Sequence, residues 1–112
     1  MEPLRRRADF EQVFVSGAFV GGRTVSLRIL ERGEGPTRVG FAVGKRLDKR
    51  AVIRNRVRRR LREVLRRLEL RDGYDVVVIG KRPALTEGAS ALREDVAKVC
   101  RKAGLLAEGA AT

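Results

Sequence analysis

The segment from Lys45 to Arg67 constrains the fold most, because it must bury apolar side chains while keeping a dense positive charge out of the core. It contains twelve Lys or Arg residues and only two acidic residues, Asp48 and Glu63, so it carries +10 of the chain's formal net charge of +12. Apolar residues in and just after this segment recur at helical spacing, at Val57, Leu61, Val64, Leu65 and Leu68. An amphipathic helix from about Ala51 to Leu70 satisfies both demands, with one apolar stripe against the core and the arginines outside it.

The arginine-rich side of this helix predicts a polyanionic partner, and nucleic acid before other polyanions. Between Arg54 and Arg62 there are six arginines and no acidic residue. An ordinary solvated face mixes signs, because like charges one turn apart destabilise a helix. Arginine can hold two phosphate oxygens at once, and an asparagine can bond a phosphate, a sugar hydroxyl or a base edge. One contiguous stripe of such residues runs through Asn55, Arg59, Arg62 and Arg66.

The loop before the helix carries four further basic residues, and the sequence leaves two interpretations of them open. They either extend the basic surface or are ordinary loop charges. A nucleotide-binding P-loop is excluded, because the glycine-rich Walker A pattern is absent. The four residues are Lys45, Arg46, Lys49 and Arg50.

The remaining apolar patterns predict a sheet. Alternation at Val25, Leu27 and Ile29 indicates a half-buried strand, and the continuous run 76–79 fits a strand buried on both faces. The other expected elements are helices over 8–16 and 89–103, strands over 38–44 and 74–80, and a short strand near 17–20. This order predicts an α+β fold in which helices cover an apolar sheet as a two-layer sandwich. We expect a single domain over residues 1–112, with residues 1–7 and 107–112 flexible.

Composition excludes several kinds of chemistry. The chain has no His and a single Cys, Cys100, which excludes a His/Cys zinc site, a His-based catalytic triad and an intramolecular disulfide. Its acidic residues are scattered, without the carboxylate cluster of a two-metal nuclease. We therefore expect no catalytic residue and no metal site in the chain, and a buried, inert Cys100. The lone cysteine, the lack of a spanning apolar stretch and the lack of a secretory signal favour the cytoplasm.

Phe10 and Phe14 fall on one face of the first predicted helix, together with Val13. Aromatic rings beside a basic surface can stack on unpaired bases. Spacing alone favours the plainer interpretation, in which both rings belong to the core. Phe19 and Phe41 are likewise expected to pack in the core or at its rim.

The chain resembles the protein subunit of bacterial ribonuclease P from about Leu4 to Leu105. The resemblance rests on the LRRRADFEQVFVSG opening, the RVGFAVGKR strand, the Arg54–Asn55–Arg56 signature with its basic helix, the DVVVIGKRPA strand and the final helix. It implies a mixed sheet of about four strands in the order α-β-β-β-α-β-α, similar to domains of ribosomal proteins. It also implies that the basic helix lies in a left-handed crossover between parallel strands, against the usual rule.

The resemblance further implies a function in which the protein is not the catalyst. In that family a large RNA subunit uses bound Mg²⁺ to cut precursor tRNA and so gives the mature 5′ end. The protein is an accessory subunit of this endoribonuclease, which binds the catalytic RNA and the 5′ leader of the precursor. We expect one protein for each RNA, no cofactor bound by the protein alone and no membrane partner.

The resemblance assigns roles to individual residues. By position, the RNA-binding residues are Lys45, Arg46, Arg54, Asn55, Arg56, Arg58, Arg59 and Arg62, to which the stripe described above adds Arg66. The leader-binding cleft matches Phe10 and Phe14, which turns the expectation for both rings towards stacking. In some members the position of Arg28 is aromatic and faces this cleft, where a guanidinium could instead stack or pair with a leader phosphate. Arg60, where an apolar residue is common, and Lys81, where arginine is usual, are two further departures.

Two other classes of protein fit the residues considered without the resemblance. A ribosomal or RNA-chaperone protein with the same fold would be a purely structural RNA-binding module. A DNA-binding protein would place that helix in a major groove.

Overall fold

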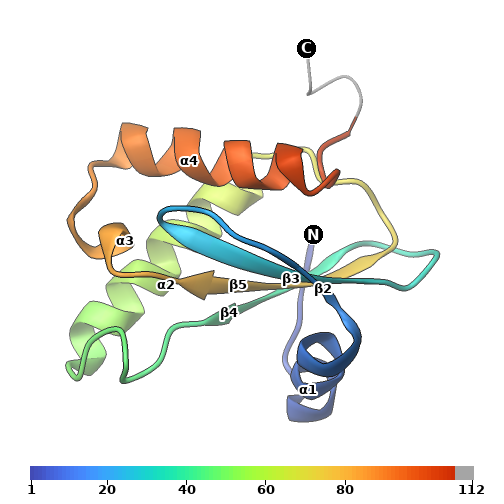
Figure 1. The fold of residues 1–112 in the computed structure, drawn as a ribbon, viewed down its shortest axis with the longest axis horizontal. Coiled ribbons are helices and arrows are strands. Elements are labelled where there is room, and N and C mark those ends of the chain that lie inside the picture. Colours follow the sequence, from blue (N-terminus) through green and yellow to red (C-terminus); the bar gives the residue numbers. More distant parts are fainter. Residues whose placement is uncertain (108–112) are drawn as a thin grey trace.

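The computed structural model describes residues 1–107, which fold around one five-stranded mixed sheet (Figure 1). The strands lie in the order β1-β4-β5-β3-β2. Their bounds are Glu2–Pro3 for β1, Ala18–Val20 for β2, Val25–Glu31 for β3, Arg38–Ala42 for β4 and Tyr74–Gly80 for β5. Strand β4 pairs in parallel with both β1 and β5, and β3 pairs antiparallel with both β5 and β2.

Four helices cover the two faces of this sheet unequally. They are α1 (Arg7–Ser16), α2 (Ala51–Arg66), α3 (Pro83–Thr86) and α4 (Ala89–Lys102). Helices α2 and α4 lie over one face, and α1 lies against the other (Figure 1). The α+β class, the mixed sheet and the α-β-β-β-α-β-α order are therefore confirmed, with β1 and α3 as additions. The basic helix α2 connects the parallel strands β4 and β5; the left-handed sense of that connection stays a prediction.

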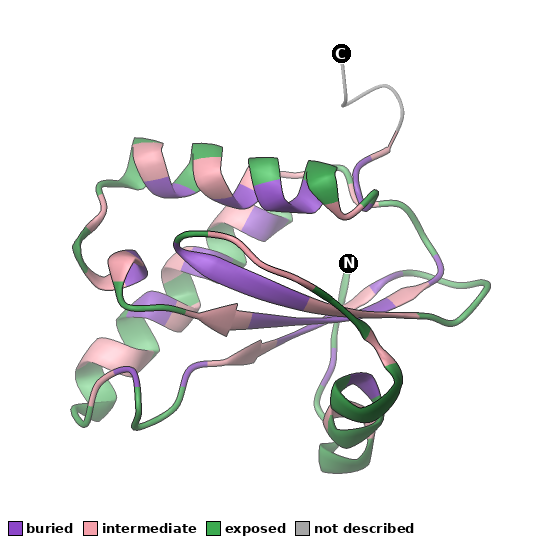
Figure 2. Cartoon of the chain, in the orientation of Figure 1, coloured by how far each residue is buried: buried purple, intermediate pink, exposed green. Residues whose placement is uncertain are grey.

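The central strand β5 is buried on both faces, as its continuous apolar run predicts. Val76 and Val78 enter the main core beneath α2 and α4, whereas Val77 enters a smaller cluster with Leu4 and Val13 on the α1 side. All three valines are fully buried, and Figure 2 shows the buried colour running through the middle of the sheet. We call the side of the sheet that α1 covers the α1 face. The sheet and the layer of α2 and α4 enclose the main core, as the predicted two-layer sandwich requires. Helix α1 adds a partial third layer, because it covers only part of the α1 face.

Helix α2 packs through the predicted apolar stripe but is shorter than predicted. Val57, Leu61 and Leu65 are buried in the main core, where Leu61 is completely enclosed. The helix ends at Arg66 rather than near Leu70. Leu70 instead forms a bridge with Leu106, so a contact from the end of the chain draws this segment away from the helix axis.

The N-terminus differs from the expectation that residues 1–7 are flexible. The backbone N–H groups of Glu2 and Leu4 donate to the carbonyls of Thr37 and Val39, both at 2.9 Å. Leu4 is only 4% exposed. These contacts make β1 the fifth strand, beyond the four implied by the resemblance. At the other end Ala107 donates to the carbonyl of Glu69 at 2.8 Å, and the rest of the predicted flexible tail lies outside the described residues.

A buried carboxylate joins the ends of three chain segments. Asp75 on β5 is 4% exposed and accepts hydrogen bonds from Arg32 Nε at 2.9 Å and from Arg38 Nε and Nη2 at 2.8 and 2.6 Å. Burial alone would raise the pKa of Asp75, but the hydrogen bonds and charges of Arg38 and Arg32 outweigh it and lower that pKa below its usual value. The carboxylate therefore stays ionised and ties β3, β4 and β5 together.

We predict that Asp75→Asn lowers the free energy of unfolding at pH 7 by about 2–4 kcal/mol, because two arginines lose their buried anion. A folded-state pKa that is depressed stabilises the fold above the unfolded-state pKa of about 3.9, and this contribution is lost as the pH falls through the folded-state pKa. The gap between wild type and variant should therefore be constant from pH 7 to 5 and close below about pH 4.

Urea unfolding at several pH values measures this gap. Glu31→Gln is the matched control, because Glu31 is exposed on β3 beside the same pair of strands and should change stability little. A gap that persists unchanged to the lowest pH at which the protein folds would show that the charge of Asp75 contributes nothing.

Candidate nucleic-acid interface

Three arginines of α2 bind backbone carbonyls within the protein. Arg54 donates through Nη1 to the carbonyls of Asp48 and Lys49 at 3.1 and 2.7 Å. It thereby orders the loop that leads into the helix, where hydrogen bonds from Arg50 also lower the pKa of Asp48 to about 2. The sequence-predicted RNA-binding residue Arg54 is thus half-buried and engaged at the start of α2.

Arg58 and Arg60 fasten α2 to its neighbours in the same way. Arg58 donates to Asn55 Oδ1 at 2.8 Å and to the carbonyl of Val43 at 3.2 Å, so it links the helix to the end of β4. Arg60 donates to the carbonyls of Ala84 and Glu87 at 3.4 and 2.7 Å. Arg60, where an apolar residue is common in the family, thus links α2 to the α3 segment.

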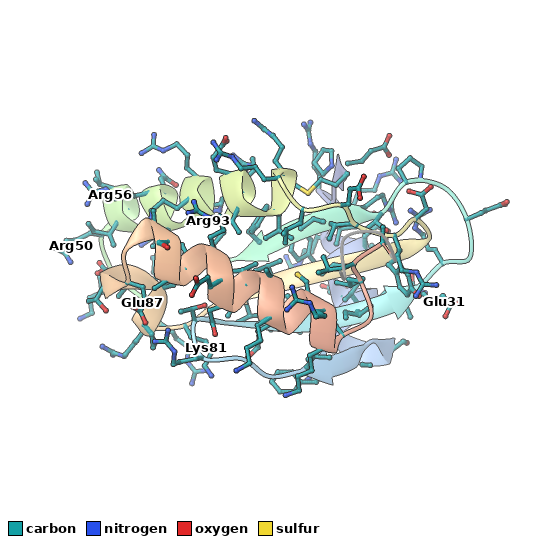
Figure 3. The ribbon with its side chains drawn as sticks, turned by 90° about the horizontal axis from the view of Figure 1, so that it is seen from above. Glu31, Arg50, Arg56, Lys81, Glu87 and Arg93 are labelled. Carbon is teal, nitrogen blue, oxygen red and sulfur yellow. The ribbon has the colours of Figure 1, made fainter. Side chains whose placement is uncertain are left out.

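The four residues of the predicted stripe lie on the surface, as does Arg56. The exposed residues are Asn55, Arg56, Arg59, Arg62 and Arg66, and Figure 3 shows Arg56 at the outer side of α2. Arg62 lies over the ring of Phe41, 5.7 Å from its centroid, which limits the directions its guanidinium can take. Arg66 pairs with the exposed Glu63, at 3.5 Å, a pair too exposed to hold it against a competing phosphate.

The basic residues continue on both sides of α2 and beyond its N-terminus. Arg58, Arg62 and Arg66 line a groove of about 730 Å³ against β4 and the N-terminal segment. Arg59, Arg60 and Arg67 line a smaller groove of about 270 Å³, with Arg93 of α4 on its opposite wall. The structure also brings Lys45 and Arg46 together with Arg58, Lys81 and Arg82 around a groove of about 700 Å³ at the carboxyl ends of β4 and β5. Lys45 and Arg46 are therefore contiguous with the helix. The sequence did not join Lys81 and Arg82 to this surface, because they follow a different strand.

The second predicted surface lies on the α1 face. The ring of Phe10 rests on Gly40, where an added Cβ would come within 2.3 Å of the ring, so only glycine admits it. Phe10 is half-buried, whereas Phe14 is 40% exposed. Arg28 belongs to this face as well, because its neighbours Leu27 and Ile29 on β3 point into or pack against the main core. The structure thus places Phe10, Phe14 and Arg28 on one side of the sheet and α2 on the other. At the β4 edge the two sides meet, because Phe10 also lines the groove of Arg58, Arg62 and Arg66.

One aromatic residue on the α1 face was missed by the sequence. Phe19 on β2 is 56% exposed, against the expectation that it packs in the core or at its rim. It is the direct cross-strand partner of Arg28. A three-residue edge strand has too few positions for its alternation to assign a face, so no sequence signal identified Phe19.

Two carboxylates and the thiol have structural roles. Asp75 is held by two arginines, and Asp95 accepts hydrogen bonds from the backbone N–H and the hydroxyl of Thr24. Burial raises the pKa of the Cys100 thiol to about 12, so it stays protonated and unreactive. Within residues 1–107 no group of three or more His, Cys, Asp or Glu could hold a metal ion, and no helix is long and apolar enough to cross a membrane.

An arginine-rich helix on one side of an α+β sheet, with exposed aromatic rings on the other, defines an RNA-binding class of protein. The family model described as Ribonuclease P matches residues 1–104. The ribonuclease P protein component of Symbiobacterium thermophilum is 43% identical over 106 residues, which cover 92% of this chain and 91% of that protein. That of Geobacillus kaustophilus is 34% identical over 109 residues, covering 95% and 89%. The chain belongs to the family of bacterial ribonuclease P protein components.

Solved structures agree with this assignment. The ribonuclease P protein of Thermotoga maritima has a TM-score of 0.81 and 25% identity, with 91% of this chain and 97% of that chain covered. The Staphylococcus aureus protein, at 23% identity and a TM-score of 0.83, shares the fold over 96% of this chain and 99% of its own. As a member of the family, the chain is the protein subunit of an endoribonuclease and acts with its RNA subunit in processing the 5′ end of precursor tRNA.

We predict that the paired change Arg59→Ala and Arg62→Ala weakens binding to a bacterial ribonuclease P RNA and lowers the salt slope of log K by about two, one for each lost phosphate contact. Both side chains are exposed and bind no backbone carbonyl, so the fold should be unaffected. Filter binding from low to high salt measures the slope. Replacing the exposed Lys98 and Arg101 of α4 by Ala removes the same charge and serves as the control. An equal loss in both variants would mean that only net charge matters.

Proposed function

We propose that this subunit binds the catalytic RNA through α2 and its adjoining loop, and the single-stranded 5′ leader of precursor tRNA through the α1 face. The observation that supports this division is the placement of the two surfaces on opposite sides of one sheet. A protein with such an arrangement can lie between the two RNAs and touch both at once. It would thereby strengthen substrate binding without taking part in the cleavage.

The α2 surface suits a folded RNA because its charges are fixed in place. Arg54 and Arg58 hold the loop and the helix together through backbone carbonyls. The exposed Arg56, Arg59 and Arg62 then project from a rigid element, which reduces the entropy lost on binding phosphates. We therefore assign phosphate contacts to the exposed arginines, with Lys45 and Arg46 extending them, and a positioning role to Arg54 and Arg58.

The α1 face suits a single strand because it combines exposed rings with positive charge. Unpaired bases can stack on aromatic side chains, and this recognition tolerates different sequences because every base has a π-face. Phe14 offers the more accessible ring, and Phe10 lies beside it on the same helix with its position fixed by Gly40. A duplex, whose bases are already stacked, would gain little from such a surface.

The chemistry of cleavage we assign to the RNA subunit and its Mg²⁺. The described carboxylates do not fit a Mg²⁺ site, because the buried or partly buried ones are held by Arg23, Arg32, Arg38, Arg50 or Thr24 and no three of them cluster within residues 1–107. One protein for each RNA and a cytoplasmic location complete the proposal, since bacterial transcripts are processed in that compartment.

The proposed function predicts that the purified protein restores cleavage of precursor tRNA by a bacterial ribonuclease P RNA at a low Mg²⁺ concentration where the RNA alone is inactive. Phe14→Ala should then weaken the binding of leader-bearing precursor to the holoenzyme by at least about fivefold, because about 1 kcal/mol or more of stacking is lost. Binding of mature tRNA, which has no leader, should be unchanged.

Val15→Ala is the matched control for Phe14→Ala, because Val15 is the next residue of α1 and is 84% exposed. Circular dichroism checks that each variant is folded. No stimulation of cleavage at any protein concentration would refute the accessory role. Equal losses of affinity for precursor and mature tRNA in Phe14→Ala would show that Phe14 has a structural role.

A further inference from the structure

Phe19 and Arg28 form a stacked pair at the outer edge of the α1 face. They are directly opposed across the antiparallel strands β2 and β3, so their side chains emerge on the same side of the sheet. The guanidinium carbon of Arg28 lies over the Phe19 ring, 5.1 Å from its centroid. This distance is within the range of a cation–π contact.

Arg28 is incompletely satisfied in this position. Its Nε is buried, yet it has no hydrogen-bond partner among residues 1–107. Every other half-buried arginine described above has a carbonyl or a carboxylate to bind. A buried donor without an acceptor is costly, and a charged one especially so. An anion that paired with the guanidinium and drew the side chain outward would relieve that cost.

Phe19, in turn, is only partly covered by its neighbours. Arg28 lies over one side of the ring, and the residue is still 56% exposed on a strand at the edge of the sheet. An exposed ring of this size on a three-residue strand contributes little to the core. Its accessible area and its neighbouring charge together match a nucleotide, which has one flat apolar base and one phosphate.

We propose that Phe19 and Arg28 form a nucleotide-binding subsite for the single-stranded leader, with one base stacked on Phe19 and an adjacent phosphate paired with Arg28. This inference rests on the proposed function of the α1 face and extends it to β2 and β3. The subsite faces away from α2 because Arg28 alternates with core residues of β3, so the leader rather than the catalytic RNA is its occupant. The leader would run from the rings of α1 across to the edge strand.

The test uses the reconstituted holoenzyme with precursor tRNA, mature tRNA and a set of precursors that each carry one abasic leader nucleotide. Phe19→Leu, which keeps apolar bulk but removes the ring, should weaken precursor binding about 5- to 50-fold and leave mature tRNA unchanged. Phe19→Tyr, which keeps the ring, should bind as wild type does. At one leader position the abasic substrate should weaken the wild type as much as Phe19→Leu does, with no further loss when the two are combined.

Arg28→Ala supplies a second, independent readout. It should lower the salt slope of precursor binding by about one and leave that of mature tRNA unchanged. The combination of Arg28→Ala with Phe19→Leu should cost less than the sum of the single losses, because the guanidinium positions the ring.

The outcomes separate this subsite from the proposed function. If Phe14→Ala weakens precursor binding selectively but Phe19→Leu does not, the subsite is refuted and the proposed function stands. If neither variant distinguishes precursor from mature tRNA, leader binding by the α1 face is itself wrong. If Phe19→Leu weakens both substrates equally, or no abasic position removes its effect, Phe19 is a structural residue.

Discussion

The structure depends on one strand that is buried on both faces. Val76 and Val78 of β5 anchor the main core beneath α2 and α4, while Val77 anchors the smaller cluster beneath α1. Asp75 in the same strand fixes the ends of β3 and β4 through two arginines. Because a strand of this kind must be covered on both sides, the chain places helices on opposite faces of the sheet. The two surfaces that we propose for RNA follow from that arrangement.

Charge is the second constraint, because α2 must fold while carrying a large excess of arginine. The protein relieves part of this repulsion internally: Arg54, Arg58 and Arg60 each donate to backbone carbonyls at the two neighbouring loops and the end of β4. The same contacts tie the helix to the sheet and to α3. The arginines that remain exposed are therefore held on a rigid element, where, under the proposed function, phosphates of the RNA subunit would neutralise them.

Periodic patterns in the sequence predicted the helices and strands that are long enough to span several periods. Tertiary contacts determined the shorter elements and the ends of the longer ones. The stripe on α2 and the apolar run of β5 carried enough periods to predict helix, strand and burial correctly. Strand β1 has two residues and no period, and α2 ends early because Leu70 bridges Leu106, a contact that spacing cannot reveal. In the candidate site, the exposed positions of Asn55, Arg59 and Arg62 followed from helical geometry. The bracing role of Arg60 and the pairing of Phe19 with Arg28 depended on which loops and strands fold beside them.

Hydrogen exchange tests most directly the claim that each face of the sheet binds a different RNA. It is measured on the free protein, on its complex with the RNA subunit, and on that complex with precursor or mature tRNA. The account predicts that the RNA subunit alone slows exchange in α2, residues 51–66, because its exposed arginines become neutralised there. Exchange in α1, residues 7–16, should slow further only when leader-bearing precursor is added, and not with mature tRNA. Slowing of α1 by the RNA subunit alone, or no change in α2 when that RNA binds, would contradict the assignment of one RNA to each face.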